Sequence, residues 1–265
     1  MVVNPVIPGF HPDPSVYRVG DDYFLACSSF EYYPGVPIFH SRDLTAWSQI
    51  GNALDRPSQL NLVTAPSSGG IYAPTLRHHD GLFLLITTNV SDRGHFIVTA
   101  QDPAGPWSDP IVIDGLPGVD PDLAWDETGA CWCTYATFGA EAGTIMQVPL
   151  DPLRGKILDE PRPLWSGTGL AAPEAPHLYR IDGNCLVRCS SMRWSKRSGW
   201  MPRRERLGSV ADPSADPSAV ASLKMTGSSS SARPYRQSNS LTPSRPTRAT
   251  PAGLSACTAV TSGSR

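Results

Sequence analysis

Three acidic residues of this sequence, Asp13, Asp120 and Glu174, lie beside or close to prolines that open similar stretches of chain. If these stretches are repeats arranged around a common axis, equivalent positions point toward that axis and the three carboxyl groups converge. Converging carboxyl groups can supply a general acid, a general base and a third charge that tunes them. An acid and a base of this kind are the pair that splitting a glycosidic bond requires.

The repeated stretch has a simple pattern: a proline, a small or polar residue, an aliphatic residue, a short polar run with a turn, and an apolar run. Whole copies begin at Pro14, Pro74 and Pro121, and a fourth begins at Pro176 and loses the pattern after Gly183. Successive opening prolines are 60, 47 and 55 residues apart. Each copy is predicted to form strand, turn and strand with room for two more strands, which is the size of a β-propeller blade.

The composition supports this fold class. The 27 prolines and 23 glycines suit short strands joined by turns, and no amphipathic helical stretch of useful length occurs before residue 184. A proline at the first residue of a strand removes no ladder hydrogen bond. We therefore predict an all-β protein of β-propeller type, with about three blades and the start of a fourth.

Each acid, taken alone, also has a purely structural interpretation, because Asp beside proline is common in turns. Asp13 and Asp120 directly precede their opening prolines, and Glu174 lies two residues ahead of its own. The second copy has Ala73 in that position, so the fold does not itself demand an acid there. The shared placement favours a catalytic role.

Five segments of the chain resemble glycoside hydrolase family 43, and within it the β-xylosidase and α-L-arabinofuranosidase branch. The segments are 4–15 (NPVIPGFHPDPS), 28–38 (SSFEYYPGVPI), 70–76 (GIYAPTL), 118–121 (GVDP) and 174–179 (EAPHLY). They occur in the family's order, and the resemblance extends to about Gly183.

The resemblance implies a five-bladed propeller and hydrolysis with inversion. Asp13 would be the general base, Glu174 the general acid, and Asp120 the residue that raises the pKa of Glu174 and orients it. Inversion needs a base and an acid roughly 6.5–9.5 Å apart, and a nearby third carboxylate keeps an acid protonated. Phe30 and Tyr72 match aromatic positions that line the sugar subsite in relatives, although core packing explains them equally well. The implied substrate is a xylo- or arabino-oligosaccharide, and no cofactor is implied.

Two other functions fit the same residues. A retaining fructan or sucrose hydrolase would share the five-bladed fold and hold its two carboxyl groups about 5–5.5 Å apart. A carbohydrate-binding relic without catalysis would keep the fold alone. The sequence indicates neither the preferred pentoside nor the oligomeric state.

The other polar residues indicate no metal site. The six histidines are scattered without ligand spacing, so surface or turn roles are expected for them. Cys131 and Cys133 would point to one face of a strand and pack there, and the six cysteines show no disulfide framework. The segment 1–5 has no signal-peptide character, and no membrane span is predicted, so a cytoplasmic location is expected.

The chain divides into a predicted catalytic domain at 1–184 and a tail at 185–265. The first part has 9 Lys and Arg against 21 Asp and Glu, whereas the tail has 13 against 3 and contains 18 serines. A disordered segment that binds nucleic acid or anionic surfaces would have this composition. A shifted reading frame near codon 184 would also give the tail this composition. We favour the shifted frame, because the change falls inside a predicted strand. On that interpretation nucleic acid is not a partner, the propeller is unclosed and the activity of the chain as written is doubtful.

Overall fold

The computed structural model describes residues 4–138, 143–167, 171–181 and 184–192, and two short strands at 221–224 and 258–260. Every helix or strand that could be assigned in these ranges is a β-strand and none is a helix, which confirms the all-β prediction. No helix of the described residues is long and apolar enough to cross a membrane. The predicted tail lies outside the described residues except for 185–192 and the two short strands.

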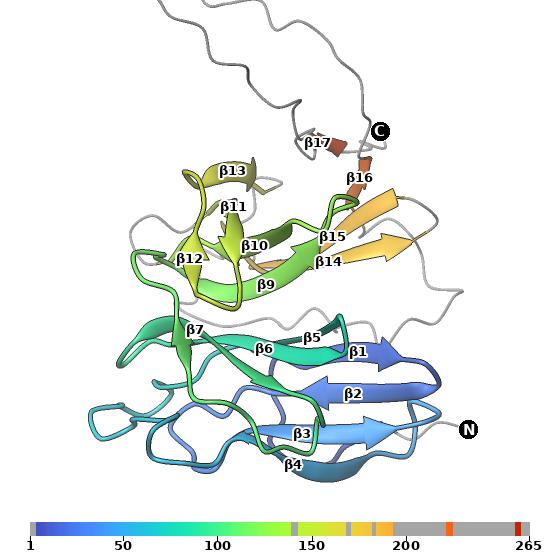
Figure 1. Cartoon of the computed structure of the whole chain (residues 1–265), viewed down its shortest axis with the longest axis vertical. Helices are drawn as coiled ribbons and strands as arrows, with labels where there is room; N and C mark the ends of the chain where they lie inside the picture. Colours follow the sequence, from blue (N-terminus) through green and yellow to red (C-terminus); the bar gives the residue numbers. More distant parts are fainter. Residues whose placement is uncertain are drawn as a thin grey trace, which may run out of the picture.

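The strands form four antiparallel sheets, and within each sheet neighbouring strands mostly follow one another along the chain (Figure 1). The first contains β1 (Ser15–Val19), β2 (Asp22–Ala26), β3 (Gly35–Ser41) and β4 (Ser48–Leu54). The second contains β5 (Thr75–His79), β6 (Leu82–Asn89), β7 (Gly94–Ala100) and β8 (Ile111–Val112). The third contains β9 (Val119–Trp125), β10 (Cys131–Ala136), β11 (Ile145–Asp151) and β12 (Lys156–Ile157), with β13 (Arg162–Trp165) also paired to β11. The fourth contains β14 (Ala171–Ile181), β15 (Asn184–Met192), β16 (Ala221–Lys224) and β17 (Thr258–Val260).

The turn residues explain the first hairpin of the second sheet. Asp80 and Gly81 join β5 to β6 and have φ values of 49° and 77°. A two-residue turn with positive φ at both positions matches the right-handed twist of the strands, and Asp followed by Gly is a preferred sequence for it. The register of β5 on β6 then follows, with His79 opposite Leu82.

The hydrophobic core lies between successive sheets, because central strands bury both of their faces. On β6, Phe83 and Leu85 pack in a cluster with the first sheet, whereas Leu84 and Ile86 pack in a cluster with the third. This explains why the segment 82–86 is apolar without alternation. Cys133 and the neighbouring Cys131 pack in the second cluster as predicted.

The first strands of the four sheets lie next to one another in chain order, since β1 contacts β5, β5 contacts β9, and β9 contacts β14. Figure 1 shows the first two sheets in the lower half of the molecule and the other two above them. First strands that neighbour one another in this way are what inner strands around a propeller axis require.

Two opening prolines do not lie where the sequence predicts. Pro14 and Pro74 directly precede β1 and β5, but Pro121 and Pro176 lie inside β9 and β14. The strands continue past them because the pairing is irregular there. The register shifts between β9 and β10, and it shifts twice along β14. Bulges tolerate proline because the ladder is already interrupted.

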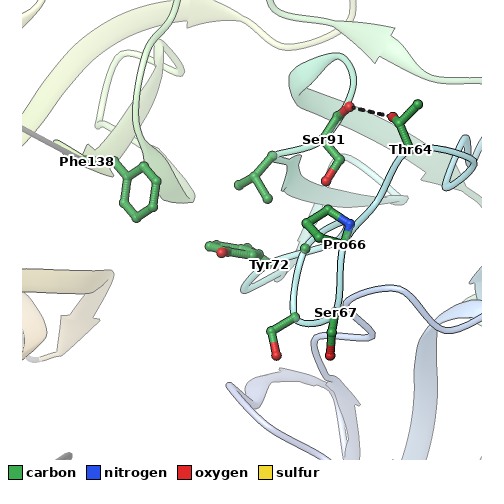
Figure 2. Close-up of a pocket in the computed structure, with 9 residues that line it drawn as sticks. Thr64, Pro66, Ser67, Tyr72, Ser91 and Phe138 are labelled. Atoms are coloured by element: carbon green, nitrogen blue, oxygen red, sulfur yellow. Dashed lines mark hydrogen bonds between the residues drawn. The ribbon is translucent and has the colours of Figure 1, made fainter. Parts of the chain in front are cut away.

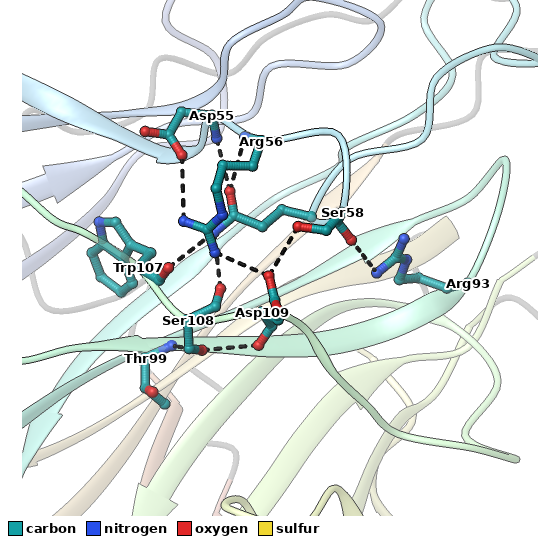
Figure 3. A network of polar contacts seen from close by, with 9 residues as sticks. Asp55, Arg56, Ser58, Arg93, Thr99, Trp107, Ser108 and Asp109 are labelled. Carbon is teal, nitrogen blue, oxygen red and sulfur yellow. Dashed lines mark hydrogen bonds and ion pairs between the residues drawn. The ribbon is translucent and has the colours of Figure 1, made fainter.

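The long segment between β4 and β5 is fixed by a polar network (Figure 3). The buried side chain of Gln59 accepts hydrogen bonds from the N–H groups of Asp55 and Arg56, at 3.0 and 3.1 Å. Its amide nitrogen donates to the carbonyls of Trp107 and Ser108, at 3.2 and 2.8 Å. The network joins the first sheet's outer edge to the second sheet.

One expectation about the histidines is wrong. His95 lies on β7 and is only 1% exposed, where surface or turn roles were predicted. Its Nδ1 is 2.8 Å from the hydroxyl of Thr88, which satisfies one polar atom of the ring. Burial lowers the pKa of His95 to about 4, so the ring is neutral and packs as part of the core.

Candidate active site

Asp13 lies in the segment that leads into β1. Its φ of 51° is in the left-handed region, which Asp tolerates better than most residues. The hydroxyl of Ser28 donates to its carboxylate at 2.7 Å, and the N–H of Ser28 donates to the carbonyl of Pro12 at 3.1 Å. Ser28 follows β2, so the end of the first hairpin holds the acid in place.

Asp120 and Glu174 lie on neighbouring first strands, β9 and β14. Asp120 has a φ of 55°, and Ala175 has a φ of 49°. The carboxylate of Asp120 accepts a hydrogen bond of 3.0 Å from the N–H of Ala175. The side chain of one acid therefore reaches the backbone directly beside the other. Both acids lie where the strand register is irregular, and bulges beside a site commonly re-aim side chains.

The pKa values place the three acids within electrostatic reach of one another. Burial, then the charge of Glu174, raises the pKa of Asp120 to about 7, with a smaller contribution from Asp13. Burial, then the charge of Asp13, raises the pKa of Glu174. Repulsion between carboxylates is reciprocal, so Asp120 and Glu174 titrate together and hold a proton up to higher pH than isolated acids do.

The sequence analysis expects Asp120 to be the charge that raises the pKa of Glu174. In the structure, burial and then the charge of Asp13 raise the pKa of Glu174, and burial and then the repulsion between Asp120 and Glu174 raise the pKa of Asp120. The individual role of Asp120 stays a prediction.

Phe30 and Tyr72 lie together, with ring centroids 5.7 Å apart at 70°. They are half-buried, and their positions are fixed by the backbone, because Phe30 exchanges two hydrogen bonds with Ile71 at 2.9 and 3.0 Å. Burial and the charge of Asp120 raise the pKa of Tyr72, so this ring lies beside the acids. Both rings are thus at the carboxylate cluster, where they can contact a bound molecule.

Two further aromatic residues near these rings were missed by the sequence analysis. Phe10 lies 6.0 Å from Phe30, and Phe138 lies 6.2 Å from Tyr72, between ring centroids. They are 63% and 57% exposed, and apolar side chains that cluster at a surface mark candidate binding surfaces. Phe10 belongs to the first segment of the resemblance, but no signal in the sequence marks Phe138.

A buried ion pair that the sequence analysis also missed lies beneath the acids. Asp122 on β9 and Arg77 on β5 have side chains 0% and 4% exposed and approach to 2.5 Å. The guanidinium of Arg77 lies over the rings of Tyr17 and Tyr179, 5.6 and 5.7 Å from their centroids. Residues from the first strands of all four sheets therefore meet at Arg77. The spacing of Asp122 from Asp120 could have placed both acids on one side of a strand.

In the described part of the chain, no group of three or more His, Cys, Asp or Glu side chains is arranged to hold a metal ion. What the carboxylate cluster can do is exchange protons with a bound molecule. It combines two partly buried acids of raised pKa with Asp13, whose carboxylate accepts a hydrogen bond at the end of the first hairpin.

Comparison with known proteins adds independent information. A sequence model described as glycosyl hydrolases family 43 matches residues 2–243. A xylosidase/arabinosidase of Butyrivibrio fibrisolvens is 48% identical over 190 residues, covering 68% of this chain and 37% of that protein. A non-reducing end alpha-L-arabinofuranosidase of Bacteroides ovatus is 44% identical over 182 residues, covering 67% of this chain and 34% of that protein.

The fold is similar to that of a solved structure. The crystal structure of xylan beta-1,4-xylosidase from Bacillus halodurans superimposes with a TM-score of 0.68 and 39% identity, covering 72% of this chain and 39% of that one. The chain spans little more than a third of the length of the relatives it matches.

Proposed function

The chain belongs to glycosyl hydrolases family 43, and on that premise we propose that it hydrolyses xylosidic or arabinofuranosidic bonds of plant-type oligosaccharides. The observation that carries this proposal is the carboxylate cluster. Asp120 accepts a hydrogen bond from the residue next to Glu174, and Asp13 lies close enough to influence the pKa of both. The substrate class is supported by the similarity to a xylosidase/arabinosidase and to an alpha-L-arabinofuranosidase.

The proposed mechanism is inverting. Asp13 is the general base that removes a proton from water, and the hydrogen bond from the hydroxyl of Ser28 holds its carboxylate in position. Glu174 is the general acid, and the direction of its pKa shift, raised by burial and by the charge of Asp13, favours the protonated form that a general acid needs. Asp120 orients the strand that carries Glu174 and titrates together with Glu174. Phe30 and Tyr72 contact the sugar ring.

The fold that goes with this function is proposed to be a five-bladed propeller. Support comes from the succession of first strands around Arg77 and from the match to solved members of the family. We further propose that residues from about 185 onward derive from a shifted reading frame. The support for this is the reversal of charge between the two parts of the chain.

The test is hydrolysis of aryl β-xyloside and aryl α-L-arabinofuranoside by the chain and by a form with the frame restored near codon 184. Release of the aryl alcohol together with an inverted sugar product, followed by proton NMR, is the expected result. A product of retained configuration would favour the retaining alternative. Sugar binding without hydrolysis in the restored form would reduce the protein to a carbohydrate-binding role.

A further inference from the structure

Successive copies of the repeat are joined through the backbone of one equivalent residue. This residue is the aliphatic one two places after the opening proline, namely Leu76, Leu123 and Leu178 in the second, third and fourth copies. Each of them is hydrogen-bonded to a side chain of the copy that precedes it. The same position therefore receives every junction.

Two of these hydrogen bonds are accepted by the residue that directly follows the opening proline of the preceding copy. The hydroxyl of Ser15, which is 1% exposed, accepts from the N–H of Leu76 at 3.1 Å. The carboxylate of Asp122, which is 0% exposed, accepts from the N–H of Leu178 at 2.6 Å. The position after the opening proline thus carries an acceptor that reaches the first strand of the next copy.

The junction between the second and third copies uses a different side chain. Arg77, three places after Pro74, donates from Nε to the carbonyl of Leu123 at 3.0 Å. The receiving residue is again the one two places after its proline, although its carbonyl is used in place of its N–H. The receiving position is therefore constant, and the side chain that reaches it varies.

His177 holds the acceptor position in the fourth copy. It directly follows Pro176, as Ser15 and Asp122 follow their own prolines. Its Nδ1 is buried and has no hydrogen-bond partner among the described residues. β14 is the first strand of the last sheet that these residues form. A buried polar atom without a partner is destabilising, so the position calls for a donor.

The hydroxyl groups beside Tyr72 differ from His177, because neighbouring residues of the chain already satisfy them (Figure 2). The hydroxyl of Thr64 donates to the carbonyl of Ser91 at 3.4 Å. The hydroxyl of Ser91 accepts from the N–H of Gly70 at 3.0 Å. These groups need no further partner, whereas Nδ1 of His177 does.

The surroundings of His177 keep its ring neutral. Burial, and then the charges of Arg77 and Arg188, lower the pKa of His177 to about 3. In a neutral imidazole one nitrogen donates a hydrogen bond and the other accepts one. His177 can therefore present an acceptor, as Ser15 and Asp122 do.

We propose that His177 is the docking point for the first strand of a further repeat copy, and that its Nδ1 accepts a hydrogen bond from the N–H two places after the opening proline of that copy. The partner is an extended strand that begins with a proline, any residue and an aliphatic residue. It is supplied by the continuation of the chain in the frame restored near codon 184, so the inference rests on that part of the proposed function. His177 lies three residues after Glu174, and the docked strand therefore also fixes β14 beside the candidate general acid.

The first test is NMR on the frame-restored form labelled with nitrogen-15. A hydrogen bond from a backbone N–H to a histidine nitrogen gives a scalar coupling between the two nitrogens, which identifies the donor residue. We expect a coupling between Nδ1 of His177 and an aliphatic residue that lies two places after a proline beyond residue 184. Val16 holds the equivalent position in the first copy. A coupling to Val16 would overturn the proposal, because the fourth sheet would then close directly on the first.

Variants test the same hydrogen bond through stability, measured by urea unfolding. His177→Leu removes the acceptor and should lower the folded-to-unfolded ratio of the frame-restored form about tenfold. It should cause no loss in the chain as written, which lacks the donor strand. His177→Asn keeps an acceptor and should recover most of the loss. Ser15→Ala is the matched control, because its partner Leu76 is present in both forms, and its loss should be equal in both.

Equal losses for His177→Leu in the two forms, or no loss in either, would overturn the docking point. Hydrolysis of aryl pentosides by the frame-restored form would then leave the proposed activity intact. The converse result is a coupling at His177 and a loss confined to the frame-restored form, in a protein that hydrolyses no pentoside. That result would sink the proposed activity and leave the docking point standing.

Discussion

Asp122 and Arg77 form an ion pair of 2.5 Å in which the two side chains are 0% and 4% exposed. The other carboxylate oxygen of Asp122 accepts a hydrogen bond of 2.6 Å from the N–H of Leu178. Asp120, two residues earlier, accepts from the N–H of Ala175. Two acids of β9 thus hold β14 at two points, and Glu174 lies at the first of them. Asp120 thus holds the backbone beside the candidate general acid, and the Asp122–Arg77 pair holds the same strand further along, at Leu178.

Asp122→Asn should strongly destabilise the fold. The substitution leaves the charge of Arg77 buried without its partner, and breaking buried pairs in this way costs about 3–5 kcal/mol. Urea unfolding followed by circular dichroism measures the change.

The matched control for that variant is Asp109→Asn. Asp109 also pairs with an arginine, Arg56, at 3.0 Å, but its side chain is 73% exposed. Exposed ion pairs contribute little to stability, so Asp109→Asn should lose much less stability than Asp122→Asn. Equal losses for the two variants would contradict the central role given to Asp122.

Stability should fall as pH rises from about 4 to 7 because of Asp120. Its folded-state pKa of about 7 is above the ordinary value of 3.8, so the folded state binds the proton more tightly than the unfolded state does. The contribution is fully present below pH 3.8 and is lost as pH passes through about 7. Asp120→Asn removes the charge and keeps an oxygen that can accept from Ala175. Relative to the unmodified chain it should gain up to about 4 kcal/mol at pH 8.

The comparison is made by urea unfolding of both proteins at pH 4 and pH 8. Asp43→Asn is the control, because it should change stability at pH 8 in the opposite direction. Hydrogen bonds from the N–H groups of Ala46 and Thr45 lower the pKa of Asp43 to about 2. Its contribution is present above pH 3.8 and is lost as pH falls toward 2, so that variant should lose stability at pH 8. A gain for Asp120→Asn that is as large at pH 4 as at pH 8 would show that Asp120 does not titrate in this way.

Local sequence was enough to predict some of this structure and not the rest. Asp80 and Gly81 specify a hairpin turn by their own conformational preferences. The placement of the three acids near the prolines that open the repeated copies follows from the repeat. The bulges beside Asp120 and Glu174 depend on which strands pair, which no local pattern records. Arg77 was missed because arginine is rarely buried, and only its partner in a different sheet makes burial tolerable.

Restoring the reading frame near codon 184 should raise pentosidase activity. Glu174 pairs with Ser190 of β15, and residues 185–192 belong to the part of the chain assigned to the shifted frame. General acid catalysis needs the proton donor held within hydrogen-bond reach of the leaving oxygen. The strand that pairs with Glu174 should therefore affect how efficiently Glu174 protonates the leaving oxygen. The measurement is kcat/KM on aryl xyloside for both forms, and equal values would make the tail a genuine part of the enzyme.

Glu174→Ala in the frame-restored form should lower turnover most for substrates with poor leaving groups. General acid catalysis contributes about 10²–10⁴-fold, and a leaving group that departs readily as an anion does not need it. A series of aryl xylosides with leaving groups of increasing pKa should give a steep decline in kcat for the variant and a shallow one for the parent. Glu160→Ala is the control, because Glu160 is exposed between β12 and β13 and is not one of the three acids of the cluster. If Glu174→Ala lowers kcat by the same factor for every leaving group, Glu174 is not the proton donor, and another group must protonate the departing oxygen.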